Sequence, residues 1–312
     1  MTAIYTFDGD ALRALEAPTA ARRLRWAAWR PDGAAALLVG NGGQAFVFDG
    51  RAFAPLATGS AHNLRGVAWA PDGRRALLCG NRGVVLLYDG QRVEQVRSPT
   101  IENLRRVAWS PDGARALIVG NGGVVLRFDA ATGRVLPLPG DRAHTLRSVA
   151  WRPDGRYALI GGNASPYAGY PRPHALYRCD GRYTQALMAT DDADDAIAID
   201  WRPNSTPAEA CVLAVAYRRN RPSNKLFTYD GHGFGHQPVD APGALLGFGW
   251  RPDGSYALLC GEGGALLRYD GGACAPIVSG TADNLVGPFW RPGVAEPTAL
   301  LLQGPAERVY TV

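Results

Sequence analysis

The chain has 312 residues, of which 46% are hydrophobic and 20% charged, with a formal net charge of +5, so it can bury one large core. It contains no apolar run near the ~20 residues of a membrane-spanning helix, and its opening residues lack the basic and apolar segments of a secretory signal. The positive charge would suit a nucleic-acid partner. However, every Lys or Arg residue except Lys225 is arginine, and this bias, with abundant Ala, Gly and Pro, is typical of GC-rich genomes. We therefore expect a bacterial, cytoplasmic monomer with neither a nucleic-acid nor a membrane partner.

The first predicted elements are two short strands, within Ile4–Gly9 and Ala11–Glu16, that form a hairpin. After them a tryptophan recurs seven times, and each is followed two residues later by a proline. The spacings are 40, 40, 42, 50, 49 and 40 residues, and the positions are Trp29, Trp69, Trp109, Trp151, Trp201, Trp250 and Trp290. A repeat of this period, built from strands and turns, predicts a β-propeller.

Each repeat is predicted to be a meander of four strands, which we call a, b, c and d. Between Leu104 and Asp129, short apolar runs are separated by the turn sequences Pro111–Gly113 and Asn121–Gly123, and an Asp-Gly corner precedes strand d in most repeats. Apolar runs this short, bounded by turn residues, favour strands over helices. In the second turn, Asn-Gly is expected to have positive φ at both residues. We therefore predict an all-β, single seven-bladed β-propeller of four-stranded antiparallel blades over residues 1–312.

The two ends of the chain are predicted to meet in the seventh blade. The N-terminal strands, at residues 3–17, complete this blade together with residues 285–312 and close the ring. The last residues, Arg308–Val312, are in phase with strand c, which leaves one c-like strand surplus.

The turn after the repeated tryptophan carries a family resemblance. The sequence Trp-Ser-Pro-Asp-Gly at 109–113, with Trp-Arg-Pro-Asp-Gly at 29–33, 151–155 and 250–254, resembles the repeats of TolB-like and divergent WD-repeat propellers. The resemblance spans nearly the whole chain and implies a protein-binding platform, since enzymes are a minority among such propellers. The Gly-His and Trp-Asp pairs of WD repeats are absent, so their hydrogen-bonded tetrad is not expected.

Residues that recur in several repeats are interpreted as scaffold. The tryptophans are expected to pack between blades, and Cys79 and Cys260, both on strand b, are expected to be buried. Five cysteines without metal-type spacing suit a reducing compartment. An arginine stands four residues before the tryptophan in four repeats, as Arg25, Arg65, Arg105 and Arg147. Their repetition suggests that they donate hydrogen bonds between blades.

Residues that occur in only one or two repeats are interpreted as functional additions. Repeat four has an insertion at 162–174, repeat five has insertions at 204–210 and 218–225, and an acidic crossover spans 191–195. Since b–c turns and d–a crossovers emerge on one face of a meander, three of these segments are expected to form a recognition site. Its predicted residues are Tyr167, Tyr170, Arg172, His174, Asp194, Asp195, Arg218, Arg219 and Arg221. Tyrosine and arginine are common interface anchors, although tolerated loop growth gives the same pattern.

A second constellation stands seven residues before the tryptophans, where the chain approaches the predicted channel mouth. Four consecutive repeats place His62, Glu102, His144 and Asp194 there, and these residue types suit a divalent metal. Polar residues lining a wet channel mouth are the alternative interpretation. No cofactor is expected apart from such a metal.

The sequence thus favours a non-catalytic scaffold that binds a protein or peptide through the face with the inserted loops. One alternative is a metal-assisted hydrolase or lyase at the channel mouth. Another is a small-molecule or glycan binder, because Tyr167, Tyr170 and Trp26 are of the type that stacks on sugars and bases. Catalytic motifs such as Gly-x-Ser-x-Gly and His-Glu-x-x-His are absent.

Overall fold

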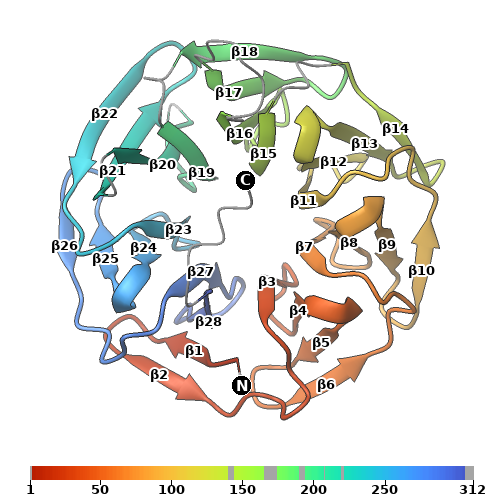
Figure 1. Cartoon of the computed structure of the whole chain (residues 1–312), viewed down its shortest axis with the longest axis horizontal. Coiled ribbons are helices and arrows are strands. Elements are labelled where there is room, and N and C mark those ends of the chain that lie inside the picture. Colours follow the sequence, from red (N-terminus) through yellow and green to blue (C-terminus); the bar gives the residue numbers. More distant parts are fainter. Residues whose placement is uncertain are drawn as a thin grey trace.

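The computed structural model describes residues 2–139, 144–164, 174–189, 194–206, 208–218 and 221–305. Seven four-stranded antiparallel sheets stand like blades around a central channel (Figure 1). The only helical elements in these ranges are short 3-10 turns. The predicted all-β, seven-bladed propeller is therefore confirmed.

The blades follow the chain in order, and the last one combines both ends. Blade 1 consists of β3 (Leu24–Trp29), β4 (Ala36–Gly40), β5 (Ala45–Phe48) and β6 (Phe53–Leu56). Blade 2 consists of β7 (Leu64–Trp69), β8 (Ala76–Gly80), β9 (Val85–Tyr88) and β10 (Val93–Val96). Blade 3 consists of β11 (Leu104–Trp109), β12 (Arg115–Gly120), β13 (Val125–Asp129) and β14 (Arg134–Pro137). Blade 4 consists of β15 (His144–Trp151), β16 (Ala158–Ala164), β17 (His174–Cys179) and β18 (Thr184–Ala189). Blade 5 consists of β19 (Asp194–Trp201), β20 (Ala210–Arg218), β21 (Arg221–Tyr229) and β22 (Phe234–Val239). Blade 6 consists of β23 (Leu245–Trp250), β24 (Ala257–Gly261), β25 (Leu266–Tyr269) and β26 (Cys274–Pro276). Blade 7 consists of β27 (Leu285–Trp290), β28 (Ala299–Gln303), β1 (Ile4–Phe7) and β2 (Leu12–Leu15).

The N-terminal segment closes the ring, as predicted. The seventh sheet has the order β2-β1-β28-β27, and Ile4 pairs with Leu302 while Phe7 pairs with Ala299. Strand β1 thus occupies the place of strand c in this blade. The predicted surplus strand, Arg308–Val312, lies outside the described residues.

The repeated tryptophans pack between blades and also tie them together. Trp109, for example, is almost completely buried beside Ile118 and Phe128 of its own blade and Cys79 of the preceding blade. Its Nε1 donates a hydrogen bond of 3.1 Å to the carbonyl oxygen of Ala68, one blade earlier. Equivalent bonds are donated by Trp69, Trp151, Trp201 and Trp290. In these five blades the tryptophan is therefore both a core residue and an inter-blade hydrogen-bond donor.

The buried cysteines behave as small apolar residues, as predicted. Cys79 and Cys260 have no exposed surface and are free thiols. Burial raises the pKa of Cys79 to about 12 and also raises that of Cys260. Both are protonated at neutral pH, and neither is suited to nucleophilic chemistry.

The turn between strands b and c differs in detail from the prediction. Asn41 opens a 3-10 turn, η1 (Asn41–Gly43), and the positive φ values fall on Gly42 and Gly43 rather than on the asparagine. The same turn recurs as η2 (Asn81–Gly83), η3 (Asn121–Gly123) and η5 (Glu262–Gly264). In η1, η2 and η3 the asparagine side chain lies beside the inner strand of its blade, where it accepts a hydrogen bond from an arginine.

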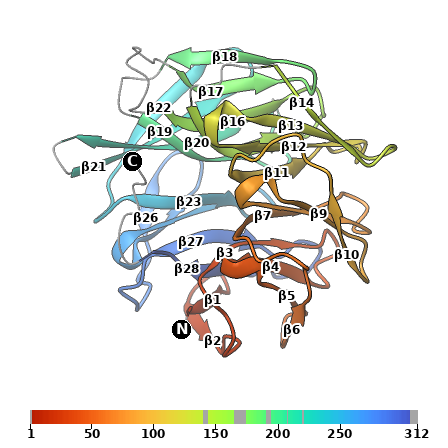
Figure 2. The same ribbon diagram turned by 45° about the vertical axis from the view of Figure 1, so that its right-hand side comes forward.

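The segment 218–225 was expected to be a loop, and most of it is strand. Strands β20 and β21 pair from Ala210↔Tyr229 to Arg218↔Arg221, and Figure 2 shows β21 reaching beyond the neighbouring strands. Strand β16 likewise continues to Ala164, and β17 begins at His174. The insertions at 162–174 and 218–225 therefore lengthen the strands next to the b–c turns on a single face, and in blade 5 they also lengthen the b–c pairing.

Candidate functional site at the channel mouth

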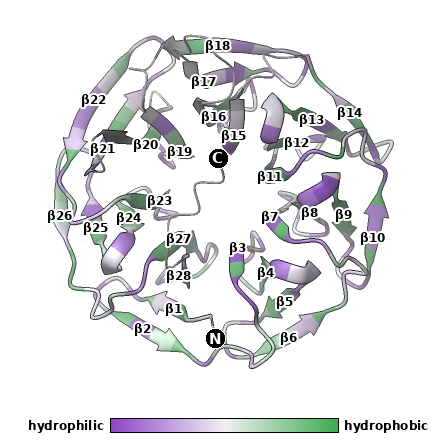
Figure 3. Ribbon diagram, viewed as in Figure 1, coloured by the Kyte–Doolittle hydropathy of each residue, from purple (hydrophilic) through white to green (hydrophobic). Residues whose placement is uncertain are grey.

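Four arginines of the inner strands form the main polar feature of the channel mouth. They stand four residues before the tryptophans of blades 1 to 4, at the position where the pairing of strands a and b skips one residue. A β-bulge redirects the side chain at such a position. We call Arg25, Arg65, Arg105 and Arg147 the arginine arc. In Figure 3, purple segments on inner strands such as β7 and β11 lie beside the channel.

Asparagines of the b–c turns orient three guanidinium groups of the arginine arc. Nε of Arg25 donates to Oδ1 of Asn41 at 2.5 Å, and Nε of Arg105 donates to Oδ1 of Asn121 at 2.6 Å. Arg65 donates to Asn81 in the same way. These bonds lie within a blade, so the predicted inter-blade role of these arginines is wrong. Among the described residues, the Nη groups of Arg25, Arg65 and Arg105 have no hydrogen-bond partner.

The arginine arc concentrates positive charge at the channel mouth. In the described part of the chain, no ion pair reaches Arg25, Arg65 or Arg105. Burial lowers the pKa of Arg25 to about 10, and burial together with the charges of neighbouring arginines lowers that of Arg105 to about 9. Arg25 and Arg105 therefore remain protonated at neutral pH, so the field at the mouth attracts anions.

The opposite wall of the mouth is apolar at the equivalent position. Blades 5, 6 and 7 have the half-buried residues Ile197, Leu246 and Val286 in place of arginine. The asparagine disappears with the arginine, because its equivalents there are Val215, Glu262 and Gly304. These three blades fold without the Arg–Asn pair. The pair is therefore not a requirement of the scaffold.

A fifth arginine, Arg106, donates hydrogen bonds to the backbone of two residues of the arginine arc. Arg106 of β11 donates from Nη1 to the carbonyl oxygens of Arg65, at 2.8 Å, and Arg105, at 2.7 Å. Its guanidinium stacks on Trp26 of blade 1, with the central carbon 3.5 Å from the ring centre. This face of Trp26 is covered, which argues against the predicted stacking of Trp26 on a sugar or base.

The predicted recognition residues fall mostly outside the described range. Tyr167, Tyr170, Arg172 and Arg219 lie outside it altogether. The backbones of four others are placed in strands, but their side chains are not described: His174, Asp194, Arg218 and Arg221. Asp195 is half-buried in β19 and pairs with Val215. The predicted recognition site thus remains a prediction.

The predicted metal site also remains a prediction. His62 and Glu102 are exposed, and their backbone N–H groups donate to the hydroxyl oxygens of Ser60 and Thr100 respectively. Neither side chain has a hydrogen-bond partner among the described residues. The side chains of His144 and Asp194 lie outside the described part. Among the residues that are described, no group of three His, Cys, Asp or Glu side chains is arranged to hold a metal ion.

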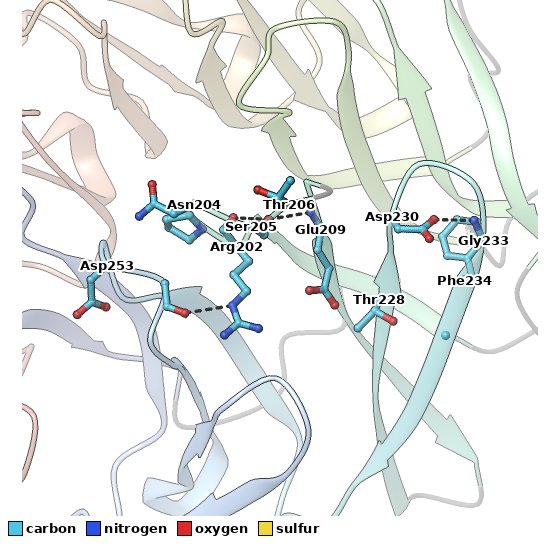
Figure 4. Close-up of a pocket in the computed structure, with 13 residues that line it drawn as sticks. Arg202, Asn204, Ser205, Thr206, Glu209, Thr228, Asp230, Gly233, Phe234 and Asp253 are labelled. Carbon is cyan, nitrogen blue, oxygen red and sulfur yellow. Dashed lines mark hydrogen bonds between the residues drawn. The ribbon is translucent and has the colours of Figure 1, made fainter.

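A polar cavity of about 760 Å³ lies on the opposite face, between blades 5 and 6. Figure 4 shows Arg202, Glu209 and Thr228 directed toward it. Several of its polar groups already have partners, since Arg202 Nε donates to the Gly254 carbonyl at 3.1 Å and Asp230 accepts two backbone N–H bonds at 2.8 Å. Part of the polar lining of this cavity is therefore already engaged in hydrogen bonds within the protein.

Comparison with known proteins shows the propeller fold. The chain is similar to the structure of YCF48 bound to a D1 peptide, with a TM-score of 0.69 and 15% sequence identity over 98% of both chains. It is also similar to the β-propeller domain of Cps50 (Swd1) from Myceliophteria thermophila, with a TM-score of 0.64 and 14% identity over 91% of this chain and 97% of that one. No protein-family model and no curated protein matches the chain. No helix in the described ranges is long and apolar enough to cross a membrane.

The sequence interpretation missed the arginine arc as a site, although one signal was available. Arginine four residues before the tryptophan occurs in the same four repeats as an asparagine at the position of Asn41, and neither residue occupies its position in the other three. A residue pair needed by every blade would recur in all seven. Its restriction to adjacent blades indicates a local function.

Proposed function

We propose that this chain is a non-catalytic propeller that binds a protein or peptide partner on the face formed by its b–c turns. The observation that carries the proposal is the arginine arc, in which the oriented Nη groups of Arg25, Arg65 and Arg105 have no partner among the described residues. Donors held in place by a second residue lose little entropy on binding, which favours recognition.

Two further observations support this face over the opposite one. The lengthened strands β16 and β17 and the lengthened hairpin β20–β21 lie on the same side as the asparagine turns, and lengthened loops or hairpins on a rigid scaffold commonly carry binding residues. The similar propeller YCF48 was solved with a bound peptide, which makes peptide binding a reasonable use of this architecture.

Site-specific photo-crosslinking tests the proposal without altering the arginine arc. A photoreactive amino acid replaces exposed Glu102 on the proposed face or exposed Arg51 at a c–d corner of the opposite face. We expect irradiation of cells that make the protein to give a discrete protein adduct from position 102 and none from position 51. Adducts from position 51 alone, or none from either position, would refute the proposed face.

A further inference from the structure

We propose that the arginine arc binds carboxylate side chains of an acidic peptide segment whose apolar residues contact Ile197, Leu246 and Val286 across the channel mouth. This inference rests on the proposed function, because it names the chemistry of the partner at the same site. It assigns a role to the division of the mouth into a cationic wall and an apolar wall.

The geometry of the arginine arc suits carboxylates. A guanidinium group presents two parallel N–H donors that match the two oxygens of a carboxylate. In Arg25 and Arg105 the Nε–H is occupied by an asparagine, which fixes the plane of the group. The Nη donors are thereby held ready for a ligand.

The positive charges around the arginine arc favour the binding of an anion. Arg106 adds a further positive charge, and its hydrogen bonds are used by the carbonyl oxygens of Arg65 and Arg105. Burial lowers the pKa of Arg106 to about 9, and the positive charges of nearby arginines, Arg65 among them, also act to lower it. A bound carboxylate would relieve this repulsion.

The opposite wall favours a peptide over a nucleic acid. Ile197, Leu246 and Val286 give apolar contact to a ligand side chain but nothing to a phosphate backbone. Two carboxylates also stand on that side of the mouth: Asp283, held by Tyr5 at 2.5 Å, and Glu262, which accepts from the Ala244 N–H at 3.1 Å. A continuous polyanion would meet these charges, whereas a peptide can direct its carboxylates toward blades 1 to 4 and its apolar residues toward blades 5 to 7.

Fluorescence anisotropy with the full chain tests this assignment. The probes are a labelled, end-blocked octapeptide of alternating glutamate and leucine, its glutamine–leucine counterpart, an all-glutamate octapeptide and a 20-nucleotide single-stranded DNA. We expect the glutamate–leucine peptide to bind at least tenfold more tightly than each of the other three. The double variant Arg65→Gln, Arg105→Gln should weaken its binding at least tenfold.

Matched variants separate the two walls from a general charge effect. Arg51→Gln with Arg74→Gln removes the same charge from exposed positions on the opposite face and should change Kd less than twofold. Leu246→Asn should weaken the glutamate–leucine peptide but leave the all-glutamate peptide unaffected. Equal weakening by both arginine pairs would overturn the assignment.

Other outcomes would also overturn it. These are tighter, arc-dependent binding of the DNA, tighter binding of a peptide with the sequence of residues 306–312, and no binding of the glutamate–leucine peptide. The cross-link from position 102 distinguishes this failure from failure of the proposed function. If the adduct persists in the Arg65→Gln, Arg105→Gln variant, the partner binds this face without the arginine arc.

Discussion

Arg106 of blade 3 stacks on Trp26 of blade 1, across the blade that lies between them, with the guanidinium carbon 3.5 Å from the ring centre. The contact is possible because the intervening blade has Gly66 at the same position. A Cβ on Gly66 would lie 2.8 Å from the Arg105 carbonyl oxygen and 3.0 Å from the Arg106 Cα. One side chain thus links three neighbouring blades below the arginine arc.

Arg106→Ala is expected to destabilise the fold by roughly 2–3 kcal/mol. The variant loses the cation–π contact and leaves the carbonyl oxygens of Arg65 and Arg105 without this donor. Arg106→Lys keeps the charge but not the planar fork, and should recover less than half of the loss. Urea denaturation measures both free energies of unfolding. Full recovery by lysine would show that charge alone accounts for the contribution of Arg106.

Arg65→Leu should change the free energy of unfolding by no more than about 1 kcal/mol. The substitution removes one hydrogen bond to Asn81 but also removes repulsion between arginines, and leucine occupies the equivalent position of blade 6. Thermal unfolding in parallel with peptide binding tests this expectation. A loss of stability above about 2 kcal/mol would mean that the arginine arc is a scaffold after all.

Gly43→Ala and Gly42→Ala form a matched pair in turn η1. Both glycines have positive φ, 73° and 65°, so each alanine costs about 1 kcal/mol in backbone strain. A Cβ on Gly43 would also lie 1.6 Å from the Ser60 carbonyl oxygen, whereas a Cβ on Gly42 meets nothing within 4 Å. We expect the Gly43 variant to lose at least about 2 kcal/mol more than the Gly42 variant in denaturation experiments. Equal losses would contradict the close approach between blades.

Trp109→Phe should destabilise the protein by about 1 kcal/mol more than Trp29→Phe. Both rings are similarly buried, at 7% and 8% exposure, and each contacts a phenylalanine edge-on. Only Trp109 donates a hydrogen bond from Nε1, because the Nε1 of Trp29 is buried without a partner among the described residues. Calorimetric Tm values of the two variants, compared with wild type, give the difference. A larger shift for Trp29 would rule out this explanation.

The carboxyl group of Asp200 is expected to make a pH-dependent contribution to the stability of the fold. Burial raises the pKa of its carboxyl to about 6, although the N–H groups of Trp201 and Trp250 donate to it. A raised acid pKa means that the folded state binds a proton more readily than the unfolded state. Its stabilising contribution is therefore complete below about pH 4 and is lost as pH rises through about 6.

The variant Asp200→Ala isolates this effect, since alanine occupies the equivalent position in blades 1 to 4. We expect the variant to gain stability relative to wild type as pH rises from about 4 to 7, by at most about 3 kcal/mol. Urea midpoints at several pH values measure the difference. A constant difference across this range would exclude the raised pKa as its cause.

The number and kind of blades and the way the ring closes could be predicted from the sequence repeat. The reason is that the tryptophan repeat and the Pro-Asp-Gly turn act within about 40 residues, where local chain geometry and burial dictate the outcome. Gly33, Gly73 and Gly113 all have the positive φ that the turn requires. Burial of Cys79 and Cys260 followed from their place on strand b, which is buried along its whole length in both blades.

Which residues meet at the channel could not be predicted in this way, because it depends on the closed ring. Arg25 and Arg105 are 80 positions apart, and they share one electrostatic environment because the closed ring brings their strands to a common channel. Polar residues at 221–225 resemble a loop in isolation, yet they pair with β20 because a partner strand lies beside them. Contacts between distant residues depend on ring closure, and no local pattern in the sequence specifies them.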